Sequence, residues 1–166
     1  MTTDRHVHLL KQVLENLRFP DRLETHPWVN SLTVMDAAAQ DRSLAEKSPG
    51  MQLVLTIGAL FRQMMPSSPP QQTGKRLDTR WGRFGILAAQ YFAPLLYGKL
   101  YPRSRRAAWR RIDQAIFAFV YGLPADELKP EQVKASQLLG DEADSAANST
   151  ISDWHREGVQ DLADLL

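Results

Sequence analysis

The amino-acid sequence predicts an all-α protein, a single compact bundle of about five to seven helices around a central helical hairpin at about residues 79–121. Three observations lead to this fold class. Apolar residues recur three and four positions apart in several segments, which is the period of an amphipathic helix. No segment alternates apolar and polar residues as a half-buried strand does. Proline, glycine and capping residues separate the helical segments.

The first predicted helix covers residues 3–18. Thr3 suits its N-cap, and its apolar face is formed by Val7, Leu10, Leu14 and Leu17. Pro20 is expected to end this helix, because proline lacks the backbone N–H that a helix interior needs.

Residues 21–50 are the least regular part of the sequence. His26-Pro27-Trp28 predicts a turn whose indole ring can be buried. After it, Asn30 or Ser31 is expected to cap a short helix that runs to about Glu46.

The segment from Met51 to Met65 is apolar on nearly all sides, which predicts a central helix that is covered on several faces. Ser48-Pro49-Gly50, just before it, is expected to close the preceding helix. Residues 66–74 are polar and proline-rich and predict a connecting loop.

The central hairpin is predicted to consist of helices at 79–97 and 104–121. The first has a wide apolar stripe and a row of small residues, which predicts the close approach of another element: Gly82, Gly85, Ala89 and Ala93. Pro94 is expected to kink this helix or to mark where it loosens. Ser104 suits the N-cap of the second helix, and Gly122 its end.

After the hairpin, Pro130 suits the first position of a further short helix. Residues 141–150 predict an exposed acidic linker. The last element is a short amphipathic helix, which a capping box of Thr150 and Asp153 is expected to open.

The composition is that of an ordinary globular protein, with 166 residues of which 43% are hydrophobic and 23% charged. We divide the chain into a helical domain at 1–140 and an acidic linker with its C-terminal helix at 141–166. The absence of cysteine excludes disulfides and thiolate metal sites. The first residues are polar rather than signal-like, and the longest apolar runs fall short of the roughly 18–20 residues that a membrane span needs. We therefore expect a soluble, cytoplasmic protein that does not contact a membrane.

Motifs for catalysis or metal binding do not occur in the sequence. The four histidines lie far apart, and His6 and His8 are not at the spacing that places two metal ligands on one face of a helix. No nucleophile motif, phosphate-binding loop or dinucleotide-binding glycine pattern is found. We expect no catalytic residue, no metal and no cofactor, and we do not expect an enzyme.

Charge is segregated along the chain, although the net charge is only +1. Residues 1–70 balance, residues 71–111 carry ten basic side chains and one acidic one, and residues 112–166 carry three basic and eleven acidic. The two later segments therefore have local charges of +9 and −8. Arginine outnumbers lysine eight to two in the basic segment, which favours recognition of carboxylates or phosphates by paired hydrogen bonds.

Three interpretations of the basic segment are open. Its arginines form a solvated surface that pairs with the acidic C-terminal third of the same chain. Alternatively, they bind an anionic protein partner, or they contact the phosphates of a nucleic acid while nearby aromatic rings stack on its bases. The small net charge and the lack of a helix-turn-helix pattern argue against nucleic acid.

We expect a small helical adaptor or accessory subunit that binds a larger protein assembly, with a nucleic-acid-binding accessory protein as the alternative. On the arginine-rich surface, the candidate partner-binding residues are Arg80, Arg83, Arg103, Arg106, Trp109 and Arg110. On the C-terminal helix, which has the pattern of a peptide that binds in a groove, they are Trp154, Asp161 and Leu165. The same pattern is equally explained by a last core helix.

Overall fold

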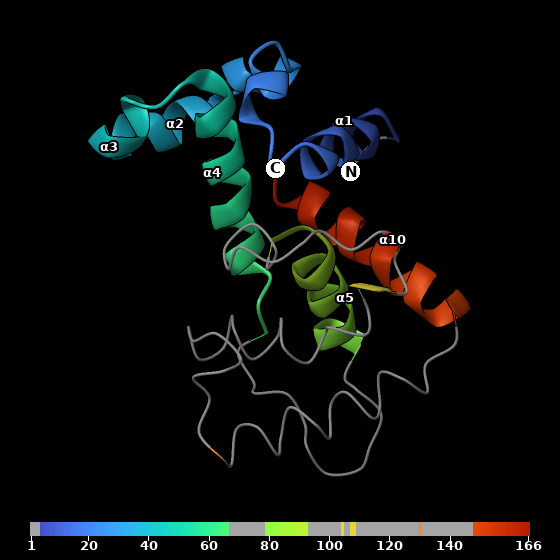
Figure 1. Cartoon of the computed structure of the whole chain (residues 1–166). Helices are drawn as coiled ribbons and strands as arrows, with labels where there is room; N and C mark the ends of the chain where they lie inside the picture. Colours follow the sequence, from blue (N-terminus) through green and yellow to red (C-terminus); the bar gives the residue numbers. More distant parts are fainter. Residues whose placement is uncertain (1–3, 67–78, 93–103, 105–106, 109–129, 131–147) are drawn as a thin grey trace. The chain divides into compact units, whose positions relative to one another are not determined.

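The computed structural model of the chain describes residues 4–66, 79–92, 104, 107–108, 130 and 148–166 (Figure 1). Every regular element among these residues is a helix, which confirms the predicted all-α fold. The chain divides into two compact units, one formed by Met1–Met64 with Gln160–Leu166 and the other by Met65–Val159. The domain boundary predicted at residues 140 and 141 lies outside the described residues.

The first unit begins with α1 (Asp4–Glu15), which buries Leu10 and Leu14 as predicted and also Val13, which the predicted apolar face does not include. The helix is shorter than expected, because it ends at Glu15 rather than next to Pro20. Pro20 instead opens the 3₁₀ helix η1 (Pro20–Leu23), where its fixed φ suits the first position.

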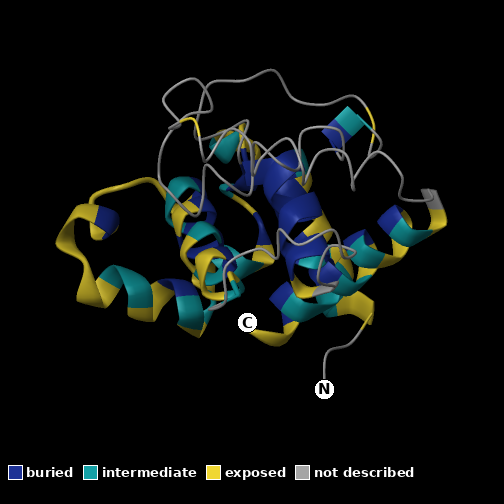
Figure 2. Ribbon diagram, turned by 90° about the horizontal axis from the view of Figure 1, so that it is seen from below, coloured by how far each residue is buried: buried dark blue, intermediate teal, exposed yellow. Residues whose placement is uncertain are grey.

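The second helix predicted for this unit is divided into two. Ser31 accepts a hydrogen bond from the backbone N–H of Val34 at 3.4 Å and caps α2 (Leu32–Gln40), which selects Ser31 over Asn30. Asp41 then interrupts the helix, because its carboxylate caps α3 (Arg42–Ala45) by accepting from the backbone N–H groups of Ser43 and Leu44 in the first turn. Most residues of α2 and α3 are partly or fully exposed (Figure 2).

The helix α4 (Pro49–Gln63) is the longest in this unit and packs against η1, α2, α3 and the 3₁₀ helix η2 (Pro27–Asn30). The prediction that Ser48-Pro49-Gly50 closes the preceding helix is wrong. Ser48 caps α4 by accepting from Met51 N–H at 3.4 Å, and Pro49 occupies its first turn. Leu55 is 45% exposed, so one side of α4 is not covered within the described residues, although its opposite side is buried.

The second unit contains α5 (Thr79–Leu87), the π-helical turn η3 (Ala88–Phe92) and the first part of α10 (Asn148–Asp164). The close approach predicted from the small residues is confirmed at Gly82. A Cβ atom there would lie 2.6 Å from a ring carbon of Trp154, so the indole packs directly on the α5 backbone. Gly158 repeats this arrangement on α10, where a Cβ would lie 2.8 Å from the carbonyl oxygen of Arg83. The two helices lie side by side (Figure 1).

Three further sequence predictions fall in this unit. The C-terminal helix begins at Asn148, so Thr150 lies inside its first turn and the predicted capping box is wrong. The backbone loosens into the π turn η3 just before Pro94, the residue expected to kink this segment. Ser104 accepts from Ala107 N–H at 3.1 Å, as expected of an N-cap, and the other residues of the helix predicted at 104–121, apart from Ala108, lie outside the described residues.

Candidate functional site

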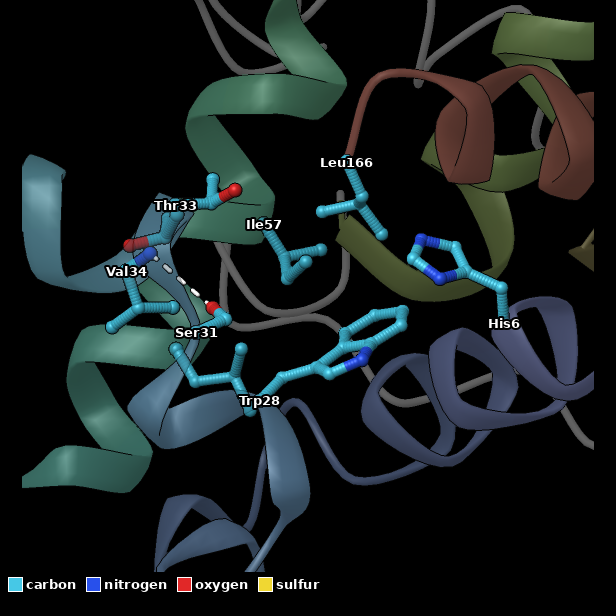
Figure 3. Close-up of a pocket in the computed structure, with 9 residues that line it drawn as sticks. His6, Trp28, Ser31, Thr33, Val34, Ile57 and Leu166 are labelled. Carbon is cyan, nitrogen blue, oxygen red and sulfur yellow. Dashed lines mark hydrogen bonds between the residues drawn. The ribbon is translucent and has the colours of Figure 1, made fainter. Parts of the chain in front are cut away.

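The first unit contains a half-open pocket of about 130 Å³ next to Trp28, which we call the Trp28 pocket (Figure 3). Its floor consists of four buried residues, Val34, Leu53, Thr56 and Ile57. Its rim consists of partly exposed residues, namely His6, Trp28, Ser31, Thr33 and Leu166. Elements that are far apart in the sequence therefore form one concave, mainly apolar surface.

Trp28 is held in place by a buried histidine that precedes it. His26 caps η2, because its Nδ1 accepts the backbone N–H of Trp28 at 3.1 Å. Its Nε2 donates to the carbonyl oxygen of Leu9 at 3.2 Å, which ties η2 to α1. The imidazole also meets the indole edge-on, with ring centroids 5.5 Å apart. The backbone and the ring of Trp28 are thus fixed from the same side.

These contacts require that His26 is neutral. Burial lowers the pKa of His26 from its ordinary 6.5, and the hydrogen bond to Leu9 partly opposes this effect. Protonation at Nδ1 would remove the acceptor that Trp28 N–H uses, so the positively charged form is incompatible with this cap. The position of Trp28 therefore depends on the protonation state of its neighbour.

A second ring lies against Trp28 at the rim of the pocket. The His6 imidazole is 4.9 Å from the indole, centroid to centroid, at an interplanar angle of 47°. His6 is the single titratable side chain among the residues that line the pocket. The other residues of the lining are aliphatic, aromatic or carry a hydroxyl group.

Two hydroxyl groups of the pocket are engaged in local hydrogen bonds. Thr56 donates to the carbonyl oxygen of Gln52 at 2.7 Å, one turn earlier in α4. Ser31 accepts from Val34 N–H, as drawn in Figure 3. Both oxygens keep lone pairs that can accept a further hydrogen bond. A bound molecule would meet an apolar floor and a rim with a few acceptors.

A wider depression lies between α2 with α3 and α4, and we call it the α2–α4 groove. Its volume is about 800 Å³. Its apolar lining comes from both sides: Ala37 and Leu44 on one, and Leu55, Ala59 and Leu60 on the other. Thr33 and Thr56 line both this groove and the Trp28 pocket, so the two depressions adjoin where α2 meets α4.

The charges beside the groove lie on one side. Asp36, Asp41 and Lys47 come from the α2 and α3 side, whereas the α4 residues that line the groove carry no charge. The exposed apolar residues Leu32 and Met35, 76% and 56% exposed, lie on α2 but do not line the groove. The first unit therefore exposes apolar surface both inside the α2–α4 groove and next to it.

Of the residues predicted to bind a partner, five are described. Arg80 is exposed at the start of α5, and Arg83 donates to Glu157 on α10, with Nε and Oε2 2.8 Å apart. Trp154 is partly buried against Gly82, while Asp161 is partly exposed and Leu165 is 42% exposed. The four remaining residues lie outside the described part of the chain: Arg103, Arg106, Trp109 and Arg110.

The five described residues are divided between the two units. Arg83 and Trp154 contact the facing helix inside the second unit, whereas Asp161 and Leu165 belong to the first. Next to the ion pair, the buried rings of Tyr91 and His155 share a hydrogen bond of 2.8 Å between the phenolic oxygen and Nε2. The side of α10 that carries Trp154 and His155 is thus used for packing within the chain.

Sequence reasoning missed both depressions, because they are built mainly from residues 21–50 and α4, with His6 and Leu166 added at the Trp28 pocket. The sequence signal for the Trp28 pocket is His26-Pro27-Trp28, which predicts a turn whose indole ring can be buried. In the part of the chain that the structure describes, no three His, Asp or Glu side chains are grouped as ligands for a metal ion. Nor does any described helix have the length and hydropathy of a membrane span.

Comparison with known proteins gives no relative: no family model matches the sequence, and no curated protein or solved structure is significantly similar to it.

Proposed function

We propose that this chain is a helical protein-binding module, an adaptor or accessory subunit, that receives an amphipathic helix of a partner protein in the α2–α4 groove. The observation that carries the proposal is Leu55, which leaves 45% of its surface in solvent on the apolar α4 side of that groove. An exposed leucine by itself is common, but here it lies beside Ala59 and Leu60 in a concave surface.

The dimensions of the groove suit a short helix. Its α4 side extends from Leu55 to Gln63, which at 1.5 Å per residue is about 12 Å, or roughly two helical turns. A partner helix would place apolar residues at positions i, i+3 or i+4, and i+7 against this length. Small residues at Ala37 and Ala59 leave room for the larger side chains of the partner.

The charges indicate how the partner helix is oriented. Asp36 and Asp41 line the α2 and α3 side, so a basic residue of the partner is expected to face them, next to its apolar stripe. The uncharged α4 side is expected to face apolar or small residues of the partner. Such an arrangement gives specificity for a helix with basic residues on one flank.

An ion pair in the second unit supports part of the first interpretation of the basic segment, in which its arginines pair with acidic residues of the same chain. Arg83 and Glu157 pair across two helices, and both side chains are about one-third exposed, so the pair adds at most about 1 kcal/mol to stability. This pairing agrees with partial neutralisation of the basic segment by the acidic one. Arg103, Arg106, Trp109 and Arg110 remain a second predicted contact with the same partner, and nucleic acid remains the alternative ligand for them.

The experiment is site-specific photocrosslinking in extracts of the source organism, with a benzophenone side chain placed at position 59. We expect crosslinks to one protein, at a segment with apolar residues three and four apart and a lysine or arginine flank. Leu55→Asp should abolish the crosslink, because it puts a charge on the apolar side of the groove. Leu32→Asp is the matched control: Leu32 is more exposed, at 76%, and does not line the groove.

Two results would contradict the proposal. Crosslinks that persist in Leu55→Asp would place the partner elsewhere, and equal loss in both variants would indicate unspecific apolar adhesion. Crosslinks to nucleic acid that survive Leu55→Asp would support the alternative function. Circular dichroism of each variant checks the fold, which we expect to be retained because both leucines are exposed.

A further inference from the structure

We propose that the Trp28 pocket is a separate binding site for a small molecule with one aromatic ring and a polar substituent. This site differs from the α2–α4 groove in its lining and in its ligand, and it does not depend on the function proposed for the groove. The size of the pocket, the aromatic rings at its rim and its hydroxyl groups support this assignment.

The size of the pocket matches a single ring. Its volume of about 130 Å³ is close to that of an engineered protein cavity of about 150 Å³ that stays dry and binds benzene. The floor binds water poorly, because Val34, Leu53 and Ile57 offer no polar group and are at most 1% exposed. An apolar ring of matching size that enters the pocket would face this apolar floor and lose its own contact with water.

The rim selects for an aromatic ring over an aliphatic one. Trp28 and His6 stand at 47° to each other with centroids 4.9 Å apart, so their faces and edges border the same opening (Figure 3). Aromatic rings attract one another in tilted and edge-to-face arrangements beyond the gain from buried area alone. The His26 cap fixes Trp28, so this wall is formed before a ligand binds.

Three residues bring hydroxyl groups to the pocket. Ser31 and Thr33 are partly exposed at the rim, and Thr56 is the one polar residue of the floor. The Ser31 and Thr56 oxygens are held in fixed positions by their bonds to Val34 N–H and the Gln52 carbonyl, which leaves lone pairs to accept a hydrogen bond. A hydroxyl or amino group on the ring is therefore expected to donate to a threonine or serine oxygen.

The experiment is a titration of the full chain with phenol, followed by ¹H–¹³C NMR of the methyl groups. Phenol should shift the methyl resonances of Val34, Leu53 and Ile57 in a saturable manner, with a Kd of about 1 mM, as expected for a ligand of this size. Cyclohexanol carries the same hydroxyl on an aliphatic ring and should bind at least about fivefold more weakly.

Variants of the rim complete the test. Trp28→Leu should weaken phenol binding about tenfold, whereas Trp28→Phe, which keeps a ring, should restore most of it. Leu55→Asp should leave phenol binding unchanged, because Leu55 lines the groove and not the pocket. The proposal is overturned if phenol gives no saturable shift up to about tenfold above the expected Kd, if Trp28→Leu binds as wild type does, or if cyclohexanol binds as well as phenol. Should Trp28→Leu fail to fold, the comparison of phenol with cyclohexanol on the wild-type chain still decides the question.

Discussion

Alanine at two glycines of α4 should have opposite effects on stability, although both substitutions add the same methyl group to the same helix. Gly58 lies in the middle of α4, and a Cβ atom there would have no heavy atom within 4 Å. Gly50 lies in the first turn and faces η1, where a Cβ would collide with the carbonyl group of Pro20, whose carbon would be 2.9 Å away.

The expected magnitudes follow from these surroundings. Gly58→Ala should stabilise the protein by about 0.5–1 kcal/mol, because alanine restricts the unfolded chain and favours the helix. Gly50→Ala should destabilise it by about 2–4 kcal/mol, because the Pro20 carbonyl is backbone and cannot rotate away. Moving η1 also weakens the bond from Gly50 N–H to Glu24 Oε2, 3.0 Å long, which caps α4 from outside the helix.

Thermal and urea unfolding, followed by circular dichroism, measure both effects. For a chain of this length, 1 kcal/mol corresponds to roughly 2–4 °C in Tm, so Gly50→Ala should lower the Tm by about 5–15 °C and Gly58→Ala should raise it by a few degrees. Equal m values would show that the comparison is between the same two states. Shifts of the same sign, or a Gly50→Ala variant as stable as wild type, would refute the close packing of η1 on α4.

Two further predictions concern His26 and the packing of α10. The folded state keeps His26 neutral while the unfolded chain takes up a proton, so the free energy of unfolding should fall as the pH decreases below 6.5. His26→Asn keeps an acceptor for the cap and should reduce this pH dependence, which urea unfolding at a series of pH values measures. Gly82→Ala should cost about 1–3 kcal/mol, because its Cβ would lie 2.6 Å from the Trp154 ring. In a Trp154→Ala background the same change should cost little, and an unchanged cost in that double-mutant cycle would exclude this contact as the cause.

The parts of the fold that depend on local chemistry could be predicted from the sequence. The spacing of Leu10 and Leu14 gives the buried side of α1, and Ser31 and Ser104 cap helices because a hydroxyl can accept an N–H of the following turn. Gly82 indicated a close approach, since glycine is unfavourable in a helix unless space is short. The sequence did not identify the element that approaches, because that information lies in the partner helix.

The predicted helix boundaries are wrong where one residue type can either end a helix, continue it or begin it. Ser48-Pro49 is typical of a turn and also of a helix start, and the structure uses it as a start because Pro49 needs no hydrogen-bonded N–H in the first turn. The sequence pattern predicts a continuous helix through Asp41. In the structure the Asp41 side chain competes for backbone N–H groups and begins a new helix, α3.

Neither depression of the first unit could be predicted, for a related reason. The apolar pattern predicts that Leu55 and Ile57 belong to a helix with much apolar surface. It does not indicate which of the two side chains is covered by other elements. Ile57 is fully buried, whereas two positions earlier Leu55 is 45% exposed. Residues two positions apart lie on opposite sides of a helix, so the difference depends on which elements pack on each side of α4, and the apolar pattern does not contain that information.

The C-terminal helix shows how packing decides between a docking peptide and a core helix with the same sequence pattern. In α10, Trp154 packs on Gly82, His155 bonds to Tyr91 and Glu157 pairs with Arg83, so three residues within one turn contact the same neighbouring segment. Substituting any of them would act on stability before it acted on a partner. Leu55 differs in this respect, because its exposed surface can be changed without loss of core packing, and for that reason the groove offers the cleaner test of function.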